Sequence, residues 1–100
     1  MTAGADLDLP PEWVPISDPT EQASLEAELR REIVSEHVLA NERVTAIARW
    51  RTRDDFLFTL DGGRVASVHL TWSVEKSPLW PATIVYDSFD EWRRVPDEDR

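Results

Sequence analysis

Arg49, Arg51 and His69 are the residues of this sequence whose types and spacing are best suited to chemistry. An imidazole titrates near neutral pH and can act as a general acid or base, and neighbouring arginines can hold an anionic group. The three residues therefore predict a ligand site for a phosphodiester or a nucleotide. No second titratable group is assured of the same position, so we assign no catalytic residue. The plainer interpretation is an exposed surface whose arginines pair with Asp54, Asp55 or the acidic N-terminal segment.

Metal and cofactor chemistry have little support in the sequence. The chain has no cysteine, which excludes disulfides, thiolate nucleophiles and cysteine-ligated zinc. His37 stands 32 positions before His69, without the HxH or HExxH spacing of a metal site, and we interpret it as a helix-end or partly buried histidine. The run Asp61–Arg64 lacks the GK[ST] ending of a phosphate-binding loop. We expect no metal and no cofactor.

The net charge of the chain is strongly negative and unevenly distributed. There are 20 acidic and 11 basic residues, a formal charge of -9, and residues 1–42 hold ten acids against Arg30 and Arg31, a net of -8. This acidity disfavours nucleic acid and favours a basic protein as partner. At such a contact we expect two aromatic residues that stand beside prolines and two acids of a predicted helix: Trp13, Trp80, Glu28 and Glu32. Packing onto the core is the competing interpretation of Trp80.

A helix is predicted from residue 19 onward. Asp18 is a suitable N-cap, Pro19 fits the first helical position, and Glu21 completes a capping box. An apolar stripe follows at every fourth residue, formed by Leu25, Leu29 and Ile33. We expect the helix to fray near His37 and its narrow stripe to pack on a sheet.

The period of the apolar residues changes to two from Val44 onward, which predicts strands. A three-residue hairpin loop at Asp61–Gly63 would pair Phe58 with Ala66, and the same parity around Thr52–Asp54 would pair Trp50 with Phe56 and Ala48 with Phe58. One face then collects the core residues Val44, Ala46, Ala48, Trp50, Phe56, Phe58, Leu60, Ala66, Val68, Leu70 and Trp72. The opposite face carries Arg49, Arg51 and His69 together.

The remaining elements complete an α+β fold: an N-terminal helix packed on a three- to four-stranded antiparallel meander, with a short C-terminal helix. Residues 83–86 form the short fourth strand, and Ser88 with Glu91 forms a capping box that opens the last helix. We divide the chain into an extended proline-rich arm (1–17), a single domain (18–95) and a charged tail (96–100). No apolar run approaches the roughly 18 residues of a membrane span, and acids occupy the N-terminus, so we expect a cytoplasmic protein without a membrane.

Three short runs of the sequence are similar to a group of small uncharacterised bacterial proteins. They are Val68–Ser73 (VHLTWS), Leu79–Pro81 (LWP), and Tyr86–Ser88 followed by Glu91 and Trp92. The resemblance extends over about residues 25–93. That group has no established function, so the resemblance implies a small bacterial α+β domain and no site residue.

Two functions from different classes fit this sequence. The leading hypothesis is a non-enzymatic interaction module that inhibits a basic partner in the manner of an immunity protein or antitoxin. The alternative is a small anion- or nucleotide-binding domain, or a phosphodiester-type enzyme, that uses Arg49, Arg51 and His69. A homo-oligomer could also form through an open sheet edge at the first strand or at the short fourth strand.

Overall fold

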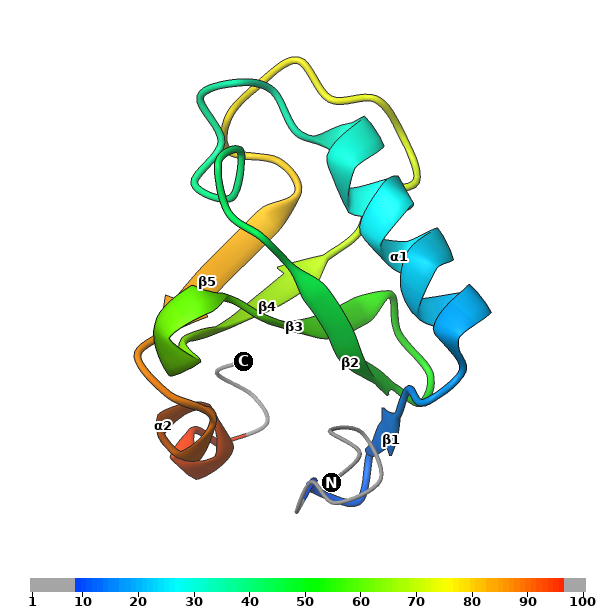
Figure 1. The fold of residues 1–100 in the computed structure, drawn as a ribbon, viewed down its shortest axis with the longest axis vertical. Coiled ribbons are helices and arrows are strands. Elements are labelled where there is room, and N and C mark those ends of the chain that lie inside the picture. The colour runs from blue at the N-terminus through cyan, green and yellow to red at the C-terminus, as the bar shows by residue number, and fades with distance from the viewer. Residues whose placement is uncertain (1–8, 97–100) are drawn as a thin grey trace.

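A five-stranded antiparallel sheet with strand order β1-β2-β3-β4-β5 is the centre of the fold (Figure 1). The computed structural model describes residues 9–96. The strands are β1 (Trp13–Pro15), β2 (Thr45–Trp50), β3 (Asp55–Thr59), β4 (Val65–His69) and β5 (Ala82–Tyr86). The helices are α1 (Pro19–Glu32), the 3₁₀ turn η1 (Asp61–Gly63) and α2 (Phe89–Arg94). The α+β class is confirmed.

The predicted strand number was too low, because part of the N-terminal arm belongs to the sheet. Trp13, Val14 and Pro15 pair with Trp50, Arg49 and Ala48. The sheet therefore has five strands, and α1 follows the first of them. Residues 1–8 of the predicted arm and residues 97–100 of the predicted tail lie outside the described residues.

Helix α1 begins at the predicted cap. The Asp18 carboxylate accepts a hydrogen bond of 2.9 Å from the backbone N–H of Thr20, and Pro19 occupies the first turn. The helix ends at Glu32, because Ile33 has an extended backbone with a ψ angle of 144°. His37 thus lies in the following loop and not at a frayed helix end, contrary to the expected helix length.

The hairpin between β3 and β4 has the predicted register. Phe58 pairs with Ala66, and the N–H of Leu60 donates 2.9 Å to the carbonyl of Arg64 across the three-residue turn. Gly62 and Gly63 have φ angles of 81° and 82°, a backbone conformation that glycine adopts without a steric penalty. The large apolar side chains of both strands therefore share a face.

The hairpin between β2 and β3 has a different register because of a bulge at Ile47. The observed partners are Ala46 with Phe58, Ala48 with Leu57, and Arg49 with Phe56. The predicted pairs of Trp50 with Phe56 and of Ala48 with Phe58 are therefore wrong. One inserted residue turns the rest of the strand over, so Ala48 and Trp50 leave the face to which strict alternation assigned them.

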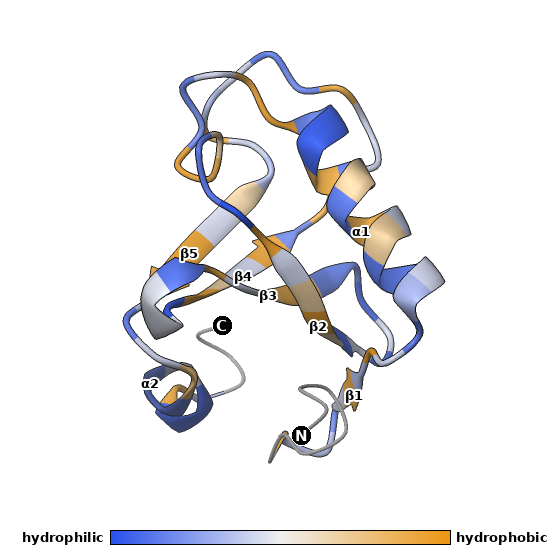
Figure 2. Ribbon diagram, in the orientation of Figure 1, coloured by the Kyte–Doolittle hydropathy of each residue, from blue (hydrophilic) through white to orange (hydrophobic). Residues whose placement is uncertain are grey.

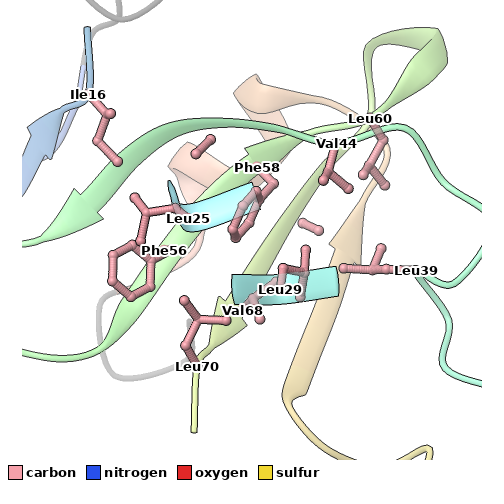
Figure 3. Packing of buried hydrophobic residues seen from close by; sticks show 12 residues of the cluster. Ile16, Leu25, Leu29, Leu39, Val44, Phe56, Phe58, Leu60, Val68 and Leu70 are labelled. Carbon is pink, nitrogen blue, oxygen red and sulfur yellow. The ribbon is translucent and has the colours of Figure 1, made fainter. Parts of the chain in front are cut away.

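The sheet separates two apolar cores. On the α1 face, Leu25 and Leu29 of the helix meet the apolar residues of β3 and β4 (Figure 3). On the other face the bulge supplies Ile47 and Ala48 to a second buried cluster, whose remaining members are Trp13, Leu57, Val65, Tyr86 and Trp92. The predicted single core face holds for the residues of β3 and β4 and fails for the second half of β2. It also fails for Trp72, which the same alternation assigned to the core and which is 48% exposed.

Helix α2 covers the second core. Its N-cap is the predicted Ser88, whose hydroxyl accepts 3.0 Å from the N–H of Glu91. The helix places Trp92 with its ring centroid 5.0 Å from that of Trp13 in an edge-on contact. Trp13 also meets Trp50 at 5.3 Å, so three indoles close this end of the molecule.

Candidate functional site

The three residues of the predicted ligand site do not meet. Arg49 lies on the α1 face, where its guanidinium is 3.3 Å from the Glu21 carboxylate. His69 lies on the opposite face of the sheet, beside Asp55. Arg51 is exposed beyond the end of β2. The expectation of one shared face is wrong, because the Ile47 bulge moves Arg49 to the side of the helix.

His69 instead lines a shallow pocket on the β3–β4–β5 surface. Its Nδ1 is 2.9 Å from Asp55, and the second carboxylate oxygen of Asp55 is 3.1 Å from Arg53. The pocket has a volume of about 240 Å³ and is lined by Asp55, Ser67, His69, Ala82, Thr83 and Ile84. When the Asp55 carboxylate accepts from Nδ1–H, the lone pair of the neutral imidazole is on Nε2. The plainer interpretation paired Arg49 and Arg51 with Asp54, Asp55 or the N-terminal segment. In the structure Arg49 pairs with Glu21 of α1, and the arginine that pairs with Asp55 is Arg53.

Glu32 was expected at a partner contact and is instead fully buried, with 0% of its surface exposed. One carboxylate oxygen accepts from the N–H and hydroxyl of Thr71 at 2.8 and 3.0 Å, and the other accepts from the N–H of Trp72 at 2.8 Å. Burial raises its pKa above the ordinary value, the neighbouring Glu28 adds to the rise, and the three donated hydrogen bonds oppose it. Its role as a surface acid is therefore ruled out by position.

Glu28 is one turn earlier on the helix and is largely covered. Its carboxylate pairs with Arg31 at 2.7 and 3.0 Å, and the hydrogen bond from Arg31 holds the pKa of Glu28 below its usual range. The pair neutralises this part of the helix surface. The acidic pattern of the helix thus contains one internal ion pair and one buried carboxylate.

His37 is a buried polar residue that fastens a second loop. Its Nδ1 accepts 3.0 Å from the N–H of Leu39, which leaves Nε2–H to donate to the carbonyl of Pro81 at 3.0 Å. Thr83 donates its hydroxyl to the same carbonyl at 2.9 Å. The sequence left two interpretations of His37, a helix-end histidine or a satisfied and partly buried one. The structure places it in the loop after α1, buried at 4% exposure, with both ring nitrogens hydrogen-bonded.

Glu32 and His37 hold the two ends of one loop, residues 70–81, which we call the anchored loop. Glu32 binds its first residues, and the backbone carbonyl of Glu32 also accepts 3.2 Å from the N–H of Glu75. His37 binds its last residue, Pro81, which follows a cis peptide bond. Side-chain acceptors and donors thus fix a long segment that has no regular secondary structure of its own.

The anchored loop carries large apolar side chains at the surface. We group them with an exposed residue of the loop after α1 under the name apolar loop surface: Val38 (60% exposed), Trp72 (48%), Val74 (65%), Leu79 (77%) and Trp80 (47%). The two loops lie at the same end of the molecule, and Figure 2 shows hydrophobic stretches in both. The expected contact residue Trp80 is among them, whereas the other, Trp13, is buried at 4% exposure in the second core.

Sequence reasoning missed the anchoring residues because their partners are distant in the chain. Thr71 and Trp72 are 39 and 40 positions from Glu32, and Pro81 is 44 positions from His37. An acid at the last turn of a helix is usually a solvated residue. The available signal was the length of the irregular stretch after His69, because such a loop needs buried hydrogen-bond partners.

Comparisons with known proteins assign no function to this chain, so the proposed function rests on the geometry. No family model, curated protein or solved structure matches the chain. The resemblance to small bacterial proteins stays a prediction. Within residues 9–96 no three histidine or acidic side chains are arranged to hold a metal ion. In the same range no helix has the length and apolar character needed to cross a membrane.

Proposed function

We propose that this protein is a non-enzymatic interaction module that binds and restrains a basic partner protein through the apolar loop surface. What supports the proposal is the contrast within the anchored loop. Its backbone is fixed by the buried Glu32 and His37, while Trp72, Leu79 and Trp80 are exposed. Burying a carboxylate and exposing indoles both oppose stability, and a contact surface gives both a purpose.

A preformed loop favours tight binding because little conformational entropy is lost on association. Aromatic anchors at a fixed position are typical of the energetic centre of protein interfaces. Trp72 is held at its backbone by Glu32 and at its ring by an edge-on contact with Phe56 at 6.1 Å. The surface can therefore present its apolar groups without rearranging.

The charge of the whole chain favours a basic partner, because the formal charge is -9. The two loops of the surface hold three acids, Glu36, Glu42 and Glu75, against the two bases Arg43 and Lys76. Acidic groups around an apolar centre accelerate encounter with a basic protein, and they repel acidic competitors. Inhibition in the manner of an immunity protein or antitoxin, and a cytoplasmic location, are the forms of this function that we propose.

The test is site-specific photo-crosslinking in the native host, followed by binding to the purified partner. A photoreactive residue replaces Leu79 in one variant and the exposed Glu91 of α2 in a matched control. We expect an adduct with a basic protein at position 79 and none at position 91. The double variant Leu79→Ser/Trp80→Ser should then bind the purified partner at least about 30-fold more weakly, the loss typical of central interface residues. Equal adducts at both positions, or unchanged affinity, would refute the proposal.

A second candidate function rests on the Asp55–His69 pair. The pocket beside it offers the His69 ring to a small anionic group, and Arg53 offsets the charge of the lining Asp55 carboxylate by pairing with it. The test is an NMR titration of the His69 ring with inorganic phosphate and with a nucleotide. Saturable shifts confined to the pocket residues would support an anion site, and the absence of shifts would remove it.

A further inference from the structure

The two edges of the sheet are protected to different degrees. At β1 the strand has three residues, ends in Pro15, and has the buried Trp13 at its start. β1 also covers β2, so the first predicted strand is not an open edge. β5 has five residues, no charge, no bulge and no internal proline. Short length and proline are common devices that prevent edge pairing, and β5 has neither.

The outward backbone groups of β5 can be assigned from the ladder. The N–H of Leu70 donates to the backbone carbonyl of Asp54 at 3.0 Å, so the backbone groups of Leu70 point toward β3. Because this direction alternates from residue to residue, it is then known for every residue of β4. Ser67 and His69 then face β5, and their partners Ile84 and Ala82 point back toward β4. The N–H and C=O groups of Thr83 and Val85 therefore point away from the sheet.

The start of this edge is already occupied within the chain. Pro81 precedes Thr83 by two residues, so its carbonyl points in the same outward direction. That carbonyl accepts hydrogen bonds from the His37 ring and from the Thr83 hydroxyl. Among the described residues, no backbone–backbone hydrogen bond outside the sheet is formed by residues 82–85. Ile84, between the two outward-facing residues, is 48% exposed. A free edge of two residues remains, with an exposed apolar side chain at its centre.

A second copy of this chain fits that edge in one symmetric register. With a two-fold axis at Ile84, Thr83 of each copy pairs with Val85 of the other, so all outward groups of both strands are satisfied by four hydrogen bonds. The two Ile84 side chains then form a non-hydrogen-bonded pair, in which side chains approach most closely. Ala82 of each copy lies opposite Tyr86 of the other, so every cross-strand pair is uncharged.

Charge makes this edge the favourable place for self-association. Each copy has a formal charge of -9, which opposes contact between most of their surfaces. Residues 77–86, which include β5, contain no charged residue. Two acidic chains can therefore approach here with the least repulsion.

We propose that the protein forms a weak symmetric homodimer by antiparallel pairing of β5 with β5 of a second copy, centred on Ile84. Strand pairing over five residues gives a small interface, so the dimer is concentration-dependent. Ile84 and Ala82 also line the pocket beside His69, so the second copy extends the wall of that pocket. The dimer uses a surface separate from the apolar loop surface, and the two proposals stand independently.

Sedimentation velocity over a concentration series of about 10 µM to 1 mM tests the dimer, since this range spans weak association. We expect the wild type to shift from monomer to dimer. Ile84→Glu and Ile84→Lys each place like charges directly opposite one another, so each alone should weaken the dimer by about tenfold or more. An equimolar mixture of the two variants should recover association, because opposite charges then meet across the axis. Ala23→Glu changes an exposed residue of α1 that belongs to neither proposed surface, so it is the control for added charge and should dimerise like the wild type.

Each outcome decides the proposal. A wild type that stays monomeric at the highest concentration overturns it, as does a dimer that Ile84→Glu leaves unchanged. Circular dichroism of each variant shows that the fold is intact. Val85→Pro provides a second route, because the outward N–H of Val85 is outside the internal ladder and its loss should weaken the dimer. The Val85 side chain also packs on the α1-face core, so Val85→Ala, which keeps the N–H, is the control for lost packing. A mixture that fails to associate would exclude the register centred on Ile84.

Discussion

The five tryptophans divide into two groups that are stabilised in different ways. Trp13, Trp50 and Trp92 pack against one another on the α2 face, with ring centroids 5.0 and 5.3 Å apart around Trp13. Trp72 and Trp80 belong to the anchored loop and are about half exposed. The first group is held by apolar burial, and the second is positioned by hydrogen bonds to its backbone.

This difference shows that an aromatic side chain can be ordered without being buried. In the α2 core the indoles contribute stability directly, because their surface is removed from water. In the anchored loop Glu32 and His37 stabilise the backbone, and this backbone holds the indoles of Trp72 and Trp80 at the surface. Substitutions in the two regions should therefore separate effects on stability from effects on binding.

The largest expected effect is at the buried group. Trp92→Ala removes a fully buried indole and should lower the free energy of unfolding by about 3–5 kcal/mol, whereas Trp80→Ala should change it by about 1 kcal/mol or less. Urea denaturation of both variants measures the difference. Equal losses would mean that Trp80 is a core residue and would break the comparison.

The next largest effect on the free energy of unfolding is expected at Glu32, which holds the start of the anchored loop. Glu32→Ala leaves the N–H groups of Thr71 and Trp72 without their acceptor and should lower the free energy of unfolding by about 1–3 kcal/mol. Glu32→Gln keeps one carbonyl acceptor and should lose less. Chemical denaturation of the two variants distinguishes lost hydrogen bonds from lost volume. A larger loss in Glu32→Gln than in Glu32→Ala would contradict this role.

A smaller effect on the free energy of unfolding is expected at Arg53, which covers the ring of Trp50. The Arg53 guanidinium lies 3.9 Å from the centroid of the Trp50 ring and also pairs with Asp55. Arg53→Ala should cost about 0.5–1 kcal/mol, the range of exposed cation–π contacts. Arg51→Ala, two residues earlier, is the control. Thermal unfolding that fails to separate the two variants would count against the contact.

The pH dependence of stability provides the finest comparison. The pKa of Glu32 in the folded protein is raised above its ordinary value of 4.5. Protonation of Glu32 therefore adds to the free energy of unfolding. This stabilisation is fully present below pH 4.5 and is lost as the pH rises through the raised pKa. The wild type should therefore gain stability relative to Glu32→Gln as the pH falls from neutral toward 4.5. The lowered pKa of Glu28 has the opposite sign and acts below 4.5. Urea denaturation at several pH values tests this, and a difference that shrinks on acidification would refute it.

Local patterns predicted the elements whose signals are contained in a few neighbouring residues. The Asp18 and Ser88 caps and the turn at Asp61–Gly63 depend on contacts within a few positions, and all three are confirmed. The bulge at Ile47 could not be read in this way. The alternation of apolar and polar residues in the sequence continues through Ile47 without a break. The two consecutive residues Ile47 and Ala48 are both buried in the second core, whose members Trp13 and Trp92 are distant in the chain.

The same reasoning explains which parts of the candidate site could be predicted. Trp80 was identified because a tryptophan beside a proline in a loop is a local feature. Glu32 was assigned to the surface because an acid in the last turn of a helix is usually solvated, and its donors lie in a loop that begins 39 positions later. The separation of Arg49 from His69 follows from the bulge alone.

The most direct test of the account is the backbone mobility of the anchored loop in solution. Nitrogen-15 relaxation gives order parameters for the amides of Trp72, Glu75 and Trp80, each of which donates a hydrogen bond that fixes the loop. A preformed surface predicts order parameters of about 0.85, equal to those of the β3 and β4 strands. Values below about 0.6 at these three amides would show a flexible loop and would contradict the central claim.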